Sequence, residues 1–188
     1  MIKVGITGSI ASGKTTASKI ISKNKGPLFS ADKVVKKLYT SKNFKKTVSI
    51  KLNIQQNTNF KKAIKIRISK SDKFLSRLGK IIHPLVRKQM YIFTKKNKNK
   101  KFIFFEIPLL VENKLYKYFD TIILIKSKKS LRLKRYKSKV GNDNLFTTFD
   151  KKQLKDNKKI KFCDHIVVNN SSLIVLKKKL NNIINLYE

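Results

Sequence analysis

Short apolar runs alternate with segments of helical periodicity along most of the chain. Five runs predict strands, at residues 2–7, 28–29, 102–105, 121–125 and 165–168. After the first and last of these runs, apolar residues recur every three or four positions and predict amphipathic helices; they are Ala17, Ile20 and Ile21, and then Leu173, Leu176, Leu180, Ile183 and Ile184. Strands that alternate with helices in this way predict one α/β domain whose parallel sheet is covered on both faces.

The segment between the second and third predicted strands has a different pattern. Its residues 41–100 contain no strong strand signal, and Phe74, Leu78, Ile81, Ile82 and Leu85 repeat at helical intervals. We therefore expect a helical insertion over residues 33–100. Because proline lacks a backbone donor and clashes with the preceding turn, Pro84 predicts that the helix breaks and restarts near His83.

The net charge of +36, from 46 lysines and arginines against 10 acids, has two interpretations. A basic nucleic-acid-binding protein is one of them, because many lysines displace counterions from phosphates. The other is an AT-rich genome, which favours lysine, asparagine and isoleucine codons. Lysine vastly outnumbers arginine and is spread over the whole length, so we favour the genomic origin and expect no nucleic-acid partner.

Two further features bear on the location of the protein. No apolar run approaches the length of about 20 residues that a membrane helix needs, so we expect no membrane association. The single cysteine, Cys163, excludes an internal disulfide, and we interpret it as a small core residue. Both features fit a cytoplasmic protein.

The segment after the first strand carries the clearest chemistry. Residues 8–15 match the pattern G-x-x-x-x-G-K-[ST] in full; they are Gly8, Ser9, Ile10, Ala11, Ser12, Gly13, Lys14 and Thr15. The glycines bring backbone N–H groups close to phosphate oxygens, and the helix that follows directs its positive end at the same anion. We expect Lys14 to reach the β- and γ-phosphates and Thr15 to ligate Mg²⁺. The motif alone does not separate a kinase from a GTPase or an ATP-driven motor.

A few acids and one histidine follow strands or breaks where ligands collect in α/β proteins. Asp32 is a candidate general base for an acceptor hydroxyl, or the N-cap of the next helix. Glu106 ends the third strand and is a candidate acid near the metal. Glu112 is a surface or a structural carboxylate, and His83 is a structural hydrogen-bonding group or a substrate contact.

Taken in order, several motifs resemble the dephospho-CoA kinase family over nearly the whole chain. They are GITGSIASGKTTASKI, Ser30-Ala31-Asp32, His83-Pro84, and above all residues 107–113 (IPLLVEN), followed by Leu115-Tyr116, Leu133-Lys134-Arg135, Gln153, Asp164 and the strand end at 166–170. The resemblance implies a P-loop kinase fold, with a five-stranded parallel sheet, a helical substrate-binding insertion and a lid. It also implies transfer of the ATP γ-phosphate to the ribose 3′-hydroxyl of dephospho-CoA, with Mg²⁺, by a protein that we expect to be a monomer.

The resemblance further implies roles for individual residues. Asp32 aligns with the aspartate proposed as the base. Arg135 is a further catalytic candidate, together with Lys14, and lies on the helix that leads into a lid over residues 139–158. ATP would be bound by the loop residues, by Thr16, and near its adenine by Asn169 and Asn170. Dephospho-CoA would be bound by a second set, namely Asp32, His83, Pro108, Leu109, Leu110 and Glu112.

The chain departs from the family pattern at four positions. They are Ser30, in place of the first acid of an Asp-x-Asp pair; Lys36 and Lys139, in place of arginines; and Asp156, at a lid position that is often basic. A lysine keeps the charge but loses the bidentate geometry that holds phosphate. The alternatives within enzymes are another small P-loop kinase, acting on nucleotides or shikimate, and a degenerate kinase that binds ATP without turnover.

Overall fold

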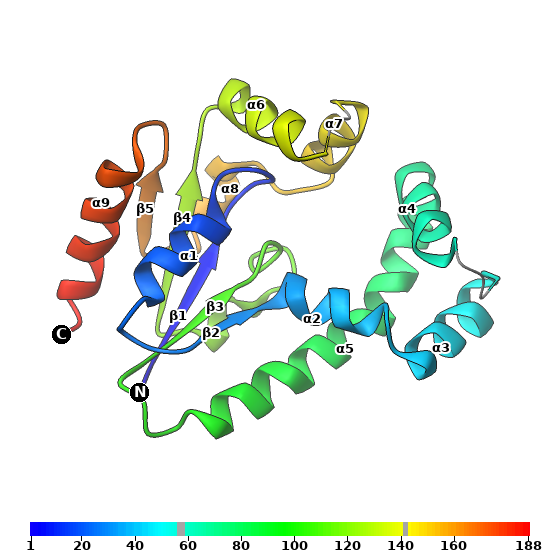
Figure 1. The fold of residues 1–188 in the computed structure, drawn as a ribbon, viewed down its shortest axis with the longest axis horizontal. Coiled ribbons are helices and arrows are strands. Elements are labelled where there is room, and N and C mark those ends of the chain that lie inside the picture. The colour runs from blue at the N-terminus through cyan, green and yellow to red at the C-terminus, as the bar shows by residue number, and fades with distance from the viewer. Residues whose placement is uncertain (56–58, 141–142) are drawn as a thin grey trace. The chain divides into compact units, whose positions relative to one another are not determined.

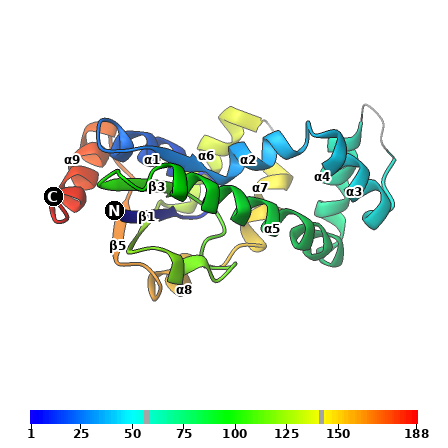
Figure 2. The same ribbon diagram turned by 90° about the horizontal axis from the view of Figure 1, so that it is seen from below.

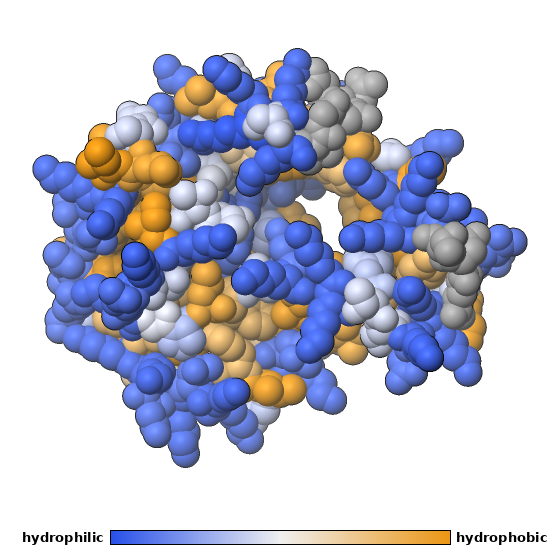
Figure 3. Space-filling view, viewed as in Figure 1, coloured by the Kyte–Doolittle hydropathy of each residue, from blue (hydrophilic) through white to orange (hydrophobic). Residues whose placement is uncertain are grey.

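The computed structural model describes residues 1–55, 59–140 and 143–188, and these residues form two compact units. One unit contains a sheet and consists of Met1–Ser30 and Asn97–Glu188, and the other is helical and consists of Ala31–Lys96. Among the helices of the described residues, none has the length and apolar character that crossing a membrane requires. Hydrophilic side chains are spread over the face seen in Figure 3, in keeping with the dispersed lysines of the sequence.

The sheet has five parallel strands, as predicted, and their order is β2-β3-β1-β4-β5 (Figure 1). Their bounds are β1 (Ile2–Thr7), β2 (Leu28–Ser30), β3 (Phe102–Glu106), β4 (Thr121–Lys126) and β5 (His165–Val168). In the register, Val4 of the central strand β1 pairs with Phe104 of β3 and with Thr121 of β4. The carboxyl ends of the strands therefore meet at one edge of the sheet, where open α/β folds bind their ligands.

Helices cover both faces of the sheet (Figure 2). On one face, α1 (Lys14–Ser22) and α9 (Leu173–Asn185) lie side by side, and Leu176, Leu180 and Ile184 of α9 join the core beneath them. The short helix α8 (Asp156–Ile160) lies on the other face. The prediction that Leu173 faces inward is wrong. Its side chain is 63% exposed, because the first turn of α9 extends past the buried core.

Three more helical segments complete the unit that contains the sheet. The 3₁₀ helix η1 (Leu115–Tyr118) precedes β4, and α6 (Lys129–Val140) follows it. The third, α7 (Asp143–Lys151), precedes α8. The range of the predicted lid, residues 139–158, therefore includes α7 and the start of α8. Its residues 141–142 lie outside the described residues.

The helical unit has a core of its own. It consists of α2 (Ala31–Leu38), α3 (Lys42–Leu52), α4 (Phe60–Lys70) and α5 (Asp72–Lys96), and its described residues contain no strand, as predicted. Side chains from the last three helices meet in one cluster that includes Phe44, Val48, Leu52, Phe60, Ile64, Phe74 and Leu78. This separate cluster explains why residues 31–96 form a compact unit.

The predicted helix break at Pro84 is wrong, since α5 runs without interruption from Asp72 to Lys96. Pro84 is exposed, and so is Lys80, whose carbonyl would otherwise accept a hydrogen bond from residue 84. Water can therefore satisfy that carbonyl. Buried side chains on both sides of the proline, Leu78 before it and Val86 after it, hold the two halves of α5 in line.

Candidate active site

The glycine-rich segment 8–13 joins the carboxyl end of β1 to the N-terminus of α1. Gly8 and Gly13 have φ values of 149° and 98°, and a Cβ at Gly13 would lie 2.2 Å from the amide nitrogen of Asn169. Only glycine fits both the conformation and the space. Ala11 also has a left-handed φ of 56°, which costs a non-glycine residue about 1 kcal/mol. The segment is thus a tight, strained turn that directs a helix N-terminus at its concave side, an arrangement suited to an anion.

Lys14 lies folded against the turn that precedes it. Its Nζ donates a hydrogen bond to the carbonyl oxygen of Ser9 at 2.8 Å, and the lysine is 8% exposed. The backbone N–H of Ser12 donates to the same oxygen at 3.1 Å. A buried ammonium group beside a helix N-terminus concentrates positive charge where phosphate oxygens would bind. The predicted contact of Lys14 with phosphates stays a prediction.

The two predicted metal ligands lie together. The Thr15 hydroxyl donates to Glu106 Oε1 at 2.5 Å. Glu106 ends β3 and is 2% exposed, whereas Thr15 is exposed in the first turn of α1. The described residues contain no group of three or more histidine, cysteine or acidic side chains that could hold a metal on its own. Because Mg²⁺ typically takes one or two carboxylates and completes its shell with water and substrate phosphates, this pair of hard oxygen donors fits it.

Asn169 and Arg135 hold the turn through the carbonyl group of Ser12. The Asn169 amide Nδ2 donates to the carbonyl oxygen of Ser12 at 2.9 Å, and Arg135 Nη1 donates to the same oxygen at 3.4 Å. The other guanidinium nitrogen, Nη2, donates to the carbonyl oxygen of Asn169 at 3.1 Å. The guanidinium of Arg135 thus makes structural contacts in this structure, and its catalytic role stays a prediction.

Asn170 serves the neighbouring connection between β4 and α6. Its Oδ1 accepts hydrogen bonds from the backbone N–H of Lys128 at 2.9 Å and from the Ser127 hydroxyl at 3.1 Å. The polar ends of both asparagines, Asn169 and Asn170, therefore organise backbone. Their predicted place near adenine is not tested by these contacts.

The segment after β3 contains the predicted substrate residues 108–112. The Thr7 hydroxyl donates to the carbonyl oxygen of Pro108 at 3.1 Å, which ties this segment to the end of β1. Pro108 and Leu109 are partly exposed. Leu110 does not line a surface: it is 0% exposed, and its Cδ1 lies 2.9 Å from where a Cβ would be on Gly5. Leu110 is a core residue in this structure because it covers the face of β1 that Gly5 leaves open, and its contact with substrate stays a prediction.

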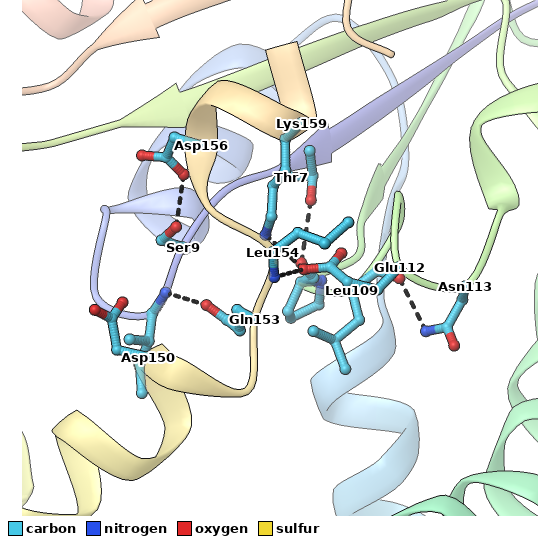
Figure 4. A network of polar contacts seen from close by, with 12 residues as sticks. Thr7, Ser9, Leu109, Glu112, Asn113, Asp150, Gln153, Leu154, Asp156 and Lys159 are labelled. Carbon is cyan, nitrogen blue, oxygen red and sulfur yellow. Dashed lines mark hydrogen bonds and ion pairs between the residues drawn. The ribbon is translucent and has the colours of Figure 1, made fainter. Parts of the chain in front are cut away.

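Glu112 forms an ion pair with Lys159, whose Nζ lies 2.8 Å from Glu112 Oε1 (Figure 4). The same oxygen accepts a hydrogen bond from the backbone N–H of Leu154 at 3.2 Å. The side chain of Lys159 is 0% exposed and that of Glu112 is 15% exposed. This ion pair is a structural contact, and the predicted substrate role of Glu112 stays a prediction.

Asp32 and His83 belong to the helical unit. Asp32 is exposed in the first turn of α2, where its charge also favours the helix. His83 is partly buried on α5 against Gly79, one turn earlier. Burial and the nearby charge of Arg87 lower the pKa of His83, so its ring is neutral at physiological pH and able to donate or accept a hydrogen bond.

Sequence reasoning predicted no contact with the glycine-rich turn for Arg132 or Gln153, although Gln153 is among the residues of the family resemblance. Arg132 Nη1 donates to the carbonyl oxygen of Ile10 at 3.3 Å and to Asp150 Oδ1 at 2.5 Å, and Gln153 Oε1 accepts from the backbone N–H of Ile10 at 2.8 Å. Arg132 is one of few arginines in a chain rich in lysine, and it lies one helical turn before Arg135. That scarcity was the only signal in the sequence that could have found it.

The whole arrangement has counterparts among known proteins. A model of the dephospho-CoA kinase family matches residues 2–174. A dephospho-CoA kinase of Rickettsia typhi is 31% identical over 185 residues, which cover 98% of this chain and 96% of that protein. A dephospho-CoA kinase of Bartonella quintana is 35% identical over 170 residues, which cover 87% of each chain.

Two solved kinase structures share the fold of this chain. A dephospho-CoA kinase from Campylobacter jejuni superposes with a TM-score of 0.64 at 26% identity and covers 97% of this chain and 95% of its own. A shikimate kinase from Acinetobacter baumannii shares the fold, with a TM-score of 0.55 at 11% identity, over 99% of this chain and 92% of its own. The matched family model, which spans the glycine-rich turn, Glu106 and both units, shows that this chain belongs to the dephospho-CoA kinase family.

Proposed function

We propose that the chain transfers the γ-phosphate of ATP to the ribose 3′-hydroxyl of dephospho-CoA, the last step of coenzyme A biosynthesis. The observation that carries this proposal is the complete phosphate-binding turn, with Lys14 buried against it and Thr15 beside Glu106. Membership of the dephospho-CoA kinase family supports the choice of substrate.

ATP would be bound by the turn, residues 8–13, together with Lys14, Thr15 and Thr16. The Lys14 ammonium would exchange the Ser9 carbonyl for phosphate oxygens, because a charged acceptor forms the stronger hydrogen bond. Thr15 and Glu106 would hold Mg²⁺. When bound, the ion would neutralise charge on the phosphates as the terminal phosphoryl group is transferred.

Asp32 would act as the general base. The 3′-hydroxyl oxygen attacks the γ-phosphorus, the bond from that phosphorus to ADP breaks, and the hydroxyl proton passes to the Asp32 carboxylate. Asp32 is exposed, as a group must be to meet a substrate.

The helical unit would bind dephospho-CoA. A hollow of about 810 Å³ lies among α2, α3 and α5, large enough for a substantial part of a drug-sized ligand. It combines apolar lining residues, among them Phe44 and Leu85, with the basic residues Lys51, Arg77 and Lys80. Dephospho-CoA has a pyrophosphate and a long, partly apolar arm, and this mixed lining is complementary to both. Pro84 lies at the rim next to His83, whose neutral ring would add a hydrogen bond.

The lid would comprise residues 139–158, with Arg135 on the helix that leads into it. Closure would exclude water, which otherwise competes with the 3′-hydroxyl for the phosphoryl group. Pro108 and Leu109, which are partly exposed next to the phosphate-binding turn, would contact the substrate.

An assay of ADP release with ATP and Mg²⁺ tests this function, with dephospho-CoA, AMP, shikimate and water as acceptors. We expect ADP release with dephospho-CoA and a product heavier by one phosphate. Release with another acceptor only would assign a different kinase activity. ATP binding without release for any acceptor would favour the degenerate kinase, with Lys36, Lys139 and Asp156 as the first positions to restore.

A further inference from the structure

Ser9 and Ile10, in the first half of the phosphate-binding turn, are hydrogen-bonded to side chains of the segment that follows α7 (Figure 4). Gln153 Oε1 accepts the backbone N–H of Ile10 at 2.8 Å, and Arg132 donates to the Ile10 carbonyl oxygen at 3.3 Å. Both polar groups of the Ile10 peptide units are therefore engaged by side chains that are far away in the sequence. We call Gln153 and Asp156 the loop clamp.

Asp156 makes the second contact of the clamp. The Ser9 hydroxyl donates to Asp156 Oδ1 at 2.6 Å, while the carbonyl oxygen of Ser9 accepts the Lys14 ammonium. Ser9 thus connects the clamp to the lysine that would meet the phosphates. A carboxylate close to a phosphate site repels the ligand, so its presence needs a compensating role.

A buried ion pair fixes the position of the clamp. Lys159, which is 0% exposed, pairs with Glu112 at 2.8 Å, and Glu112 also accepts the backbone N–H of Leu154. Leu154 directly follows Gln153, and Lys159 lies one turn after Asp156 on α8. Removal of either partner would strand a buried charge, and the hydrogen bond from Leu154 ties the start of this segment to the same glutamate.

We propose that Gln153 and Asp156 are positioning residues for the ATP phosphates, which they serve by holding Ile10 and Ser9 in the phosphate-binding shape. The proposal rests on the proposed binding of ATP by this turn. Its physical basis is the left-handed backbone of Ala11, a conformation that persists only where the surroundings impose it. A turn that is held in shape before ATP arrives loses less conformational entropy when it binds ATP. The clamp supplies that restraint.

The chemistry of Asp156 gives the sharpest test. Asp156→Ala removes the acceptor for the Ser9 hydroxyl, whereas Asp156→Asn keeps an acceptor oxygen and removes the negative charge. We expect Asp156→Ala and Gln153→Ala each to raise the ATP dissociation constant and KM about fivefold, the effect of one lost hydrogen bond. We expect Asp156→Asn to bind ATP at least as tightly as the unchanged protein. The KM for dephospho-CoA should stay within about twofold in all three.

The matched control is Lys161→Ala, which removes an exposed side chain at the C-terminal end of α8, outside the proposed lid, and should leave ATP binding unchanged. ATP binding is measured directly by calorimetry, and thermal unfolding shows that each variant is folded. Loss of affinity in Asp156→Asn equal to that in Asp156→Ala would overturn the positioning role, as would unchanged affinity in both alanine variants. Binding is read apart from turnover, so failure to phosphorylate dephospho-CoA would refute the proposed activity and leave the clamp standing.

Discussion

The two units of this chain differ in how their functional surfaces are built. In the unit with the sheet, the phosphate-binding turn is held by side chains from α6, from the segment after α7 and from the end of β5, among them Arg132, Gln153 and Asn169. In the helical unit, the hollow is lined by side chains of α2, α3 and α5 that also belong to or border that unit's own core.

The difference predicts a division of labour. Phosphate chemistry needs donors fixed in place before the ligand arrives, and the turn meets that need through a dense set of hydrogen bonds. A long, flexible substrate needs area and a few charges, which the hollow offers. Changes in the residues that hold the phosphate-binding turn should therefore act on ATP and turnover, and changes in the hollow should act on dephospho-CoA.

The largest expected effect comes from Lys14→Ala. Removal of the buried ammonium should lower kcat/KM by about 10²-fold or more, because the negative charge of the transferred phosphoryl group then loses a positive partner. Steady-state kinetics with ATP and dephospho-CoA measure this loss. The control is Lys19→Ala, which takes an exposed lysine from the same helix. Equal losses in the two variants would mean that general charge, and not the position of Lys14, matters.

The next effect separates binding from turnover within the helical unit. Asp32→Asn should cut kcat about tenfold or more and leave the ATP dissociation constant nearly unchanged, because the amide cannot take the hydroxyl proton. Asp72→Asn makes the same change in the first turn of α5 and serves as the control. Near-normal turnover of Asp32→Asn would remove Asp32 from the base role.

A smaller effect tests the hollow. Lys80→Gln should raise the KM for dephospho-CoA about threefold to tenfold with no change in the KM for ATP, since it removes one positive charge from the lining. The control is Lys88→Gln, at an exposed position of α5 outside the lining. If the KM for ATP rose instead, the division between the units would be wrong.

The smallest effect concerns a group outside both sites. Burial, followed by the charge of Asp164, raises the pKa of the Cys163 thiol to about 12. Because the thiolate is the reactive form, the native thiol should stay protonated and react slowly with a disulfide reagent up to mildly alkaline pH. Reaction should become fast after denaturation. Fast reaction of the native protein at neutral pH would contradict this assignment.

The sequence was most informative where function depends on neighbouring residues. The turn at residues 8–15 and all five strands follow from local pattern, because apolar runs and the glycine spacing are contiguous. The continuous helix through Pro84 was not predictable, since it depends on which side of α5 meets solvent. Core burial of Leu110 depends on the open face of Gly5, more than 100 positions earlier.

The contacts of Gln153 and Asn169 with the turn were not predictable for the same reason. Gln153 contacts Ile10 across 143 positions, and Asn169 contacts Ser12 across 157, so neither contact leaves a periodic signal in the chain. Asp156 is instructive in another way. The family resemblance presented it as a departure from a basic position, and the structure gives it a hydrogen bond from Ser9.

The central claim is transfer of phosphate to one hydroxyl of one substrate. The most direct measurement compares dephospho-CoA with its 3′-deoxy analogue, with ADP release and product mass followed together. The account predicts ADP release and a product heavier by one phosphate for dephospho-CoA, and ADP release no faster than with water for the analogue. Equal ADP release with both compounds, or a phosphorylated product from the analogue, would contradict it.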